Sequence, residues 1–165
     1  MKIARKDVYA FYGTVGSAQF DLPIKTAFRY MLSKNLKKSK AEIDETDALF
    51  PAPAGYEEYF NARAGIFGEF GIGVAQNGAI DTGAIAALTA EQSAGLNDKL
   101  EKLIANNKEM LEQVSVLNDE KLKFLDEMIE IDMETVKLDD VPTISEKNGD
   151  LHWEIWRLLE LVVVK

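Results

Sequence analysis

The fold depends most on one stretch, residues 89–128, which reads TAEQSAGLNDKLEKLIANNKEMLEQVSVLNDEKLKFLDEM. An apolar row repeats every seven residues, at Leu96, Leu103, Met110, Leu117 and Phe124. Further apolar residues lie one or four positions after members of this row, and Lys and Glu fill most of the remaining surface. This spacing predicts a helix that packs one apolar face on a partner.

The start of this helix is marked by Thr89-Ala90-Glu91-Gln92, which fits a capping box between Thr89 and Gln92. As one helix from Ala90 to Met128 it would be about 58 Å long, more than a compact domain of this size covers. Residues 114–119 contain poor helix formers and a second candidate cap. Two alternatives stay open: a kink within residues 114–119, or a continuous helix 90–128 that protrudes and favours self-association.

Shorter elements surround this helix. Helical spacing predicts a helix over Val8–Val15, a second from Asp21-Leu22-Pro23 to about Ala48, and a third over Tyr56–Phe67. Asn77-Gly78 predicts a hairpin over Gly73–Thr82.

Alternating apolar and acidic residues predict a half-buried strand over residues 129–138, with a slip near Thr135. Asp150 is expected to cap a last apolar helix over Leu151–Val162. We therefore expect an α+β fold, mainly α: a helical hairpin or bundle around the long helix. Residues 73–82 and 129–138 are expected to form a small antiparallel sheet.

Size and composition predict one domain over residues 1–165. The apolar share of 47% argues against wholesale disorder. The absence of cysteine excludes disulfides, thiolate metal sites and cysteine nucleophiles, and favours a reducing compartment. No apolar run approaches the length of a membrane span, so we expect no membrane partner and a cytoplasmic protein or a component of a soluble particle.

Charge is distributed unevenly along the chain. Residues 1–40 carry nine Lys/Arg against two Asp, a net of +7, whereas residues 41–165 carry ten basic and 26 acidic side chains, a net of −16. The total of −9 argues against a binder of double-stranded DNA, because phosphate contacts need a basic surface. The basic quarter either folds against the acidic remainder or meets a phosphate group.

Catalytic and metal-binding patterns are missing from the sequence. His152 is the only histidine, and without cysteine it cannot complete a zinc site. The acidic row Glu130, Asp132 and Glu134 lacks the turn and glycine of a calcium loop. Residues 68–73 have glycines in the wrong order for a dinucleotide fingerprint. We predict a protein that is not an enzyme and uses no cofactor or metal.

Aromatic residues gather where the positive charge lies. Twelve of the fifteen aromatics, including all five tyrosines, fall in residues 1–70. Most of them sit at core spacing, but some aromatic and basic residues fall off the predicted apolar stripes. These are the candidate partner- or ligand-binding residues: Tyr9, Arg29, Tyr30, Lys34, Lys37 and Lys38. Such residues stack on and neutralise a nucleotide-like ligand, or anchor a protein interface.

Two segments carry a family resemblance: Leu22-Pro23-Ile24-Lys25 through Leu36-Lys37-Lys38, and Glu130-Ile131-Asp132-Met133 through Val141. They resemble a family of small uncharacterised phage proteins. That family opens with a short helix and a Leu-Pro-led helix rich in Lys and Asn, and it closes with an alternating acidic strand and an apolar helix. The glycine segment and the long helix depart from its shorter middle. The resemblance implies a phage or prophage origin and transfers no biochemical activity.

The leading hypothesis is a non-enzymatic, phage-encoded interaction protein that forms a homo-oligomer and inhibits a host protein, for instance a defence component. Acidic surface and exposed tyrosines would supply the contact, and the protein would act in the host cytoplasm during infection. The first alternative is a small structural or assembly component of the virion that binds other phage proteins. The second is an oligomeric binder that sequesters a nucleotide-like ligand.

Overall fold

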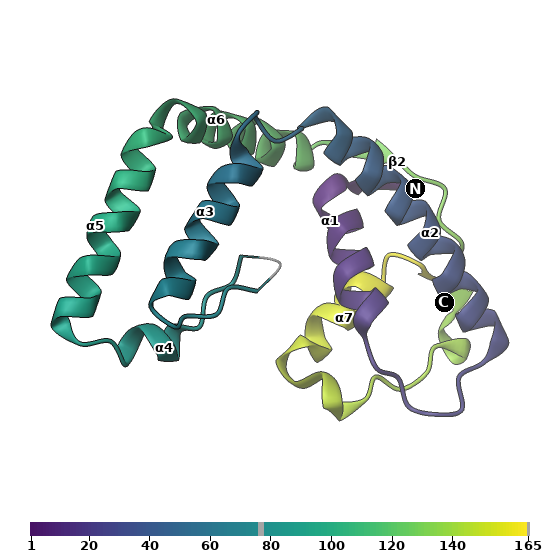
Figure 1. The fold of residues 1–165 in the computed structure, drawn as a ribbon. Helices are drawn as coiled ribbons and strands as arrows, with labels where there is room; N and C mark the ends of the chain where they lie inside the picture. The colour runs from purple at the N-terminus through teal and green to yellow at the C-terminus, as the bar shows by residue number, and fades with distance from the viewer. Residues whose placement is uncertain (76–77, 165) are drawn as a thin grey trace. The chain divides into compact units, whose positions relative to one another are not determined.

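The computed structural model describes residues 1–75 and 78–164, and these form two compact units (Figure 1). Met1–Pro51 and Glu120–Lys165 make the first unit, and Ala52–Asp119 makes the second. Most described residues are helical and the strands are short, so the predicted mainly helical α+β class is confirmed. The single domain stays a prediction, because a compact unit need not fold by itself.

The first unit combines both ends of the chain. Its N-terminal part contains β1 (Lys2–Ala4), α1 (Arg5–Ala10), the π-helix η1 (Phe11–Val15) and α2 (Thr26–Leu49). Its C-terminal part contains β2 (Met128–Glu130), β3 (Val136–Lys137), the 3₁₀ helices η2 (Leu138–Asp140) and η3 (Glu146–Leu151), α7 (His152–Leu159) and β4 (Val163–Val164).

The core of the first unit joins η1, α2 and α7. Ile155, Leu158 and Leu159 recur at helical spacing on α7 and are almost fully buried. They pack in one cluster with Phe11 of η1 and Phe28 of α2. Burying side chains of this size stabilises a fold by about 1.5–3 kcal/mol each. The last helix is thus confirmed with Ile155, Leu158 and Leu159 as its buried stripe, but it spans His152–Leu159 rather than 151–162. Leu151 is half exposed and is the N-cap of α7, so the cap expected at Asp150 is wrong.

The strands pair differently from the prediction. β1 runs antiparallel to β2, with Ile3 opposite Ile129, and β3 runs parallel to β4, with Val136 opposite Val163. The expected pairing of residues 129–138 with 73–82 is wrong, because alternation shows which face of a strand is buried but not which strand lies beside it. Residues 131–135 form no strand.

The second helix begins later than its proline suggested. Residues 21–25 are not helical, and Asp21 N donates to Thr143 O at 2.9 Å. The helix α2 then runs from Thr26 to Leu49, close to the predicted end. The start was misplaced because a Pro in a first turn permits a helix without requiring one.

The second unit is built on a helix pair. It contains α3 (Tyr56–Glu69), α4 (Thr82–Ala86), α5 (Ala90–Asn106) and residues 108–119 of α6 (Lys108–Leu125). The helices α3 and α5 lie side by side in opposite directions (Figure 1), over a small core of Phe67, Ile72 and Leu96. Val74 and Ile80 form an antiparallel bridge within the predicted hairpin. Asn77 of its predicted turn lies outside the described residues.

The long helix of residues 90–128 is two helices. Its predicted capping box is confirmed: Thr89 Oγ1 accepts from Gln92 N at 3.2 Å, and Gln92 Oε1 accepts from Thr89 N at 2.9 Å. The break lies at Asn107 (φ −118°, ψ 19°), and α6 continues through residues 114–119, so the predicted kink there is wrong. Asn107 Nδ2 donates to Leu103 O at 2.8 Å, which satisfies a carbonyl at the end of α5.

Of the helices in the described ranges 1–75 and 78–164, none has the length and apolar character needed to cross a membrane.

Candidate functional site

The cations along α2 fall into groups by their partners. One group meets the acidic segment of residues 132–140. Lys25, just before the helix, donates to Asp140 Oδ1 at 3.0 Å, and Lys38 lies 3.5 Å from Glu134 Oε1. Part of the basic quarter therefore folds against the acidic remainder of the chain, as one interpretation of the sequence expected.

A second group of cations has no carboxylate partner among the described residues. Arg29, Lys34 and Lys37 form no ion pair with any residue in the described part of the chain, and Arg29 and Lys37 are exposed. Tyr30 lies among them, 57% exposed, with Lys34 Nζ 5.5 Å from the centre of its ring. Spacings of three, four and seven residues place Tyr30, Lys34 and Lys37 on one helical face, and Arg29 lines one groove together with Lys37. We call Arg29, Tyr30, Lys34 and Lys37 the basic face of α2.

A shallow groove follows the basic face. Leu32 and Leu36 line it together with Arg29, Ser33 and Lys37. Both leucines are partly buried against the core of the first unit, so the groove has an apolar floor. The chain at Gly16 approaches this floor closely, because a Cβ there would lie 3.1 Å from Leu36 Cδ2. The surface thus combines apolar contact area with cations at its rim.

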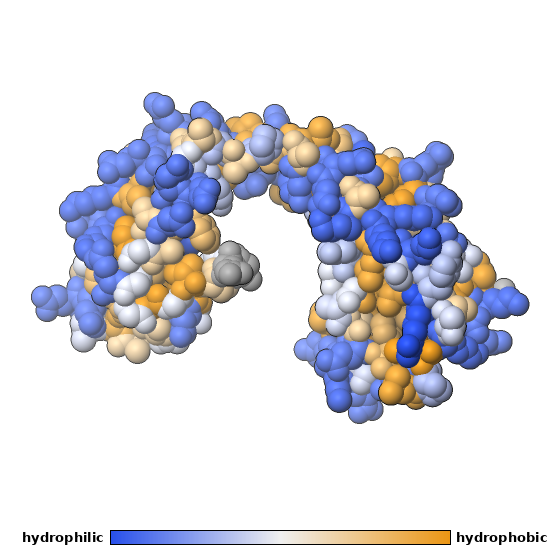
Figure 2. Space-filling model, turned by 45° about the vertical axis from the view of Figure 1, so that its right-hand side comes forward, coloured by the Kyte–Doolittle hydropathy of each residue, from blue (hydrophilic) through white to orange (hydrophobic). Residues whose placement is uncertain are grey.

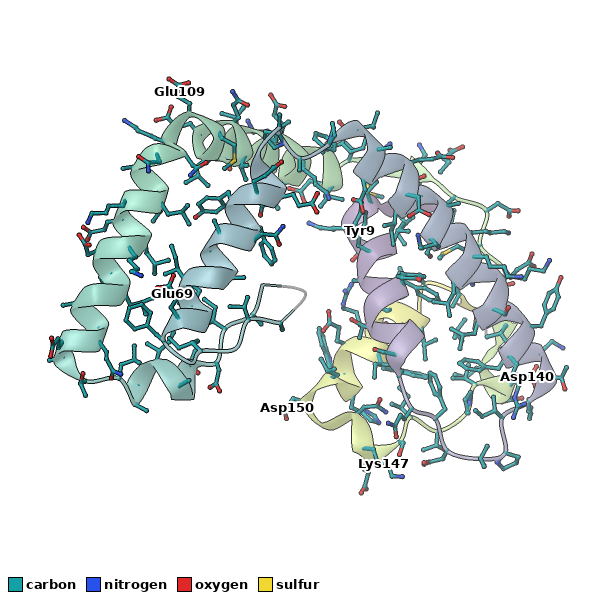
Figure 3. The ribbon with its side chains drawn as sticks, viewed as in Figure 1. Tyr9, Glu69, Glu109, Asp140, Lys147 and Asp150 are labelled. Carbon is teal, nitrogen blue, oxygen red and sulfur yellow. The ribbon has the colours of Figure 1, made fainter. Side chains whose placement is uncertain are left out.

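Tyr9 is bound inside the first unit. Its hydroxyl donates to Asp47 Oδ1 at 2.7 Å, and Figure 3 shows it on α1 beside α2. Lys121 also donates to Asp47, at 2.7 Å, and its Nζ lies 5.7 Å from the centre of the Tyr9 ring. Burial, reinforced by the Asp47 hydrogen bond, raises the pKa of Tyr9. The Lys121 hydrogen bond lowers the pKa of Asp47, with Tyr9 contributing second.

The structure therefore divides the six residues predicted from the sequence. Arg29, Tyr30, Lys34 and Lys37 lie together on the exposed basic face of α2. Tyr9 and Lys38 do not, since each is engaged by carboxylates of the first unit.

The basic face is suited to binding anions rather than to proton transfer. Three cations beside an aromatic ring attract carboxylate or phosphate groups and stack on flat ones. Within the part of the chain that is described, no three His, Asp or Glu side chains gather where they could hold a metal ion. His152 is exposed on α7, outside this face.

A second exposed surface was missed in the sequence. Figure 2 shows apolar residues reaching the surface between hydrophilic ones. The largest exposed apolar side chains are the two tryptophans of α7. Trp153 is 71% exposed and Trp156 is 36% exposed. The signal was present: both tryptophans fall off the stripe of Ile155, Leu158 and Leu159 that forms the core.

Comparisons with known proteins give no relative: no family model, no curated protein and no solved structure matches this chain.

Proposed function

We propose that this protein is a non-enzymatic interaction protein that binds an acidic segment of a partner protein through the basic face of α2. One observation carries the proposal. On a chain of net charge −9, Arg29, Lys34 and Lys37 have no carboxylate partner among the described residues and surround the exposed Tyr30. The acidic remainder of the chain repels an acidic partner, so such a partner is directed to this face.

The groove favours a protein over a nucleic acid as the partner. Leu32 and Leu36 offer apolar floor for one side chain of the partner, while the cations at the rim receive its carboxylates. A nucleic acid would need a broad basic surface, and the 26 acidic side chains of residues 41–165 repel a polyanion. Tyr and Arg are also among the residue types that contribute most to protein interfaces.

The biological setting is part of the proposal. The resemblance of residues 22–38 and 130–141 to small phage proteins supports a phage origin, and inhibition of a host defence protein in the host cytoplasm is the role that we propose. The virion alternative requires the protein in stoichiometric amounts in purified particles. The nucleotide alternative requires thermal stabilisation by a nucleotide, lost when the basic face is reversed.

The test begins with a photocrosslinking residue at the exposed Ser33, in the groove. The crosslinked host protein is identified and purified, and its Kd is measured against the wild type and against Arg29→Glu/Lys34→Glu/Lys37→Glu. Lys102→Glu/Lys108→Glu/Lys147→Glu is the matched control, because it changes net charge equally at exposed sites elsewhere.

We expect the Kd to rise at least about tenfold for the basic-face variant, equivalent to about 1.4 kcal/mol, and less than about threefold for the control. Equal weakening by both variants would mean that net charge alone drives binding and would refute the proposal. Unchanged binding by the basic-face variant would refute it as well.

A further inference from the structure

Both tryptophans of the chain are exposed on one short helix. Trp153 and Trp156 are 71% and 36% exposed, whereas Ile155, Leu158 and Leu159 bury the opposite side of α7. Tryptophan is usually well buried and is the residue most enriched at the energetic centres of protein interfaces. The core cluster of the first unit includes neither ring. The fold of this unit therefore does not require two tryptophans at the surface.

A small pocket lies beside the tryptophans. Its lining is mainly apolar: Leu138, Val141, Pro142, Thr143, Ile144, His152 and Trp156. Leu138, one of the lining residues, is 44% exposed, so apolar surface reaches the opening of the pocket. A pocket of this kind accepts one bulky apolar side chain of a partner.

The charge around this pocket is acidic. Residues 138–160 contain six Asp/Glu against Lys147 and Arg157. Arg157 is paired with Asp7 at 3.3 Å, and Asp140 is paired with Lys25 at 3.0 Å. Lys147 is therefore the one cation of this segment with no ion pair to a described residue, against five such carboxylates: Asp139, Glu146, Asp150, Glu154 and Glu160. Figure 3 shows Lys147 and Asp150 projecting outward before α7.

We infer that the α7 surface, made of Trp153, Trp156, the adjoining pocket and the neighbouring carboxylates, docks a basic segment of a partner protein. One bulky apolar side chain of that segment fills the pocket. Its Lys or Arg side chains lie over Trp153 and along Glu146 and Asp150, where cation–π and charge attraction act together. This goes beyond the function proposed above, because it uses a different surface and the opposite charge.

The same acidity excludes other occupants. An acidic peptide, a nucleic acid or an anionic membrane would meet the carboxylates of the α7 surface. A second copy of this chain could instead present its basic face of α2, and the experiment separates that outcome.

The experiment selects peptides from a random display library on the protein of residues 1–165, with counterselection on Trp153→Ala/Glu146→Lys/Asp150→Lys. All three side chains are exposed, so the variant is expected to keep the wild-type far-UV circular dichroism spectrum. We expect enriched peptides with one large apolar residue flanked by Lys or Arg. Synthetic peptides without Trp are then titrated against the wild type, with a reversed-charge peptide as the ligand control.

Tryptophan emission reports on this surface alone, since the chain has only two tryptophans and both lie on it. Binding should shift the emission to the blue and reduce acrylamide quenching. Calorimetry should show at least about a tenfold rise in Kd for Trp153→Ala and no change for Leu122→Ala, a control at another exposed apolar side chain. Arg29→Glu/Lys34→Glu/Lys37→Glu should bind these peptides normally, so failure here and failure of the α2 proposal are distinguishable.

Three outcomes would overturn the inference: enrichment of acidic or uncharged peptides, binding that Trp153→Ala leaves unchanged, and no selected peptide that shifts the emission. A blue shift that grows with protein concentration alone, together with a dimer in sedimentation, would also overturn it and assign the surface to a second copy.

Discussion

At the scale of single residues, Asn35 is the side chain that ties α2 to the C-terminal part of the first unit. It is fully buried, its Nδ2 donates to Glu134 O at 2.9 Å, and its Oδ1 accepts from Glu134 N at 2.8 Å. One amide therefore satisfies both backbone groups of a residue between β2 and β3 that no strand neighbour reaches. Asn35→Ala should lower the free energy of unfolding by about 2–3 kcal/mol, because it leaves two polar groups unsatisfied.

Ser39, one turn further along α2, supplies the matched control. Its hydroxyl is equally buried but has no hydrogen-bond partner among the described residues. Ser39→Ala removes that unsatisfied group, so it should leave the free energy of unfolding unchanged or raise it by up to about 1 kcal/mol. Urea denaturation of the two variants measures the contrast, and similar destabilisation by both would show that helix packing rather than hydrogen bonding determines these positions.

Lys37 and Lys38 show the limit of the sequence at this scale. Both fall off the apolar stripe, so the pattern treats them alike. One residue is about 100° of rotation around a helix. That rotation places Lys38 against Asp132 and Glu134 and leaves Lys37 in the groove. Which of the two lysines meets the carboxylates depends on where the acidic segment packs against α2. The sequence pattern of the helix does not show this packing.

At the scale of elements, the capping box of α5 stabilises the start of the helix through contacts between neighbouring residues. Thr89 and Gln92 each satisfy a backbone N–H of the other. Thr89→Ala should therefore lower the free energy of unfolding of the second unit by about 1 kcal/mol. Ser115→Ala is the control: it lies exposed in α6 and should raise helix stability by a few tenths of a kcal/mol. Far-UV circular dichroism during urea denaturation measures both, and an unchanged midpoint for Thr89→Ala would refute the assigned role.

The elements that the sequence predicted well are those with local causes. The cap at Thr89 and the span of α3 follow from neighbouring residues. The break lies at Asn107, where Asn106-Asn107 are both poor helix formers. Residues 114–119 also contain poor helix formers, and the prediction placed the break there instead. The strands show the same limit: β1 and β2 are more than 120 residues apart, and only the folded first unit shows that they pair.

At the scale of the whole molecule, both candidate surfaces belong to the first unit and carry opposite charge. The basic face of α2 combines Tyr30 with cations that have no ion pair to a described residue. The α7 surface combines two tryptophans with carboxylates that likewise pair with no described cation. The sequence located the first surface through its aromatic and basic residues. The second surface is missed when the last helix is treated as core throughout, although both tryptophans fall off its apolar stripe. Two such surfaces would let one unit engage two partners of different charge.

The two units have separate cores, and this separation has a consequence for unfolding. The cluster of Phe67, Ile72 and Leu96 shares no residue with the cluster of the first unit, which includes Leu158. Both tryptophans lie in the first unit, so their emission follows its unfolding alone, whereas far-UV ellipticity follows all the helices. A Leu→Ala change in a core costs about 2–5 kcal/mol. Leu96→Ala should lower the urea midpoint of part of the ellipticity and leave the tryptophan midpoint in place. Leu158→Ala should lower the tryptophan midpoint. If Leu96→Ala moves both signals together, residues 1–165 unfold as the single domain that the sequence predicts, and the two units are parts of one cooperative fold.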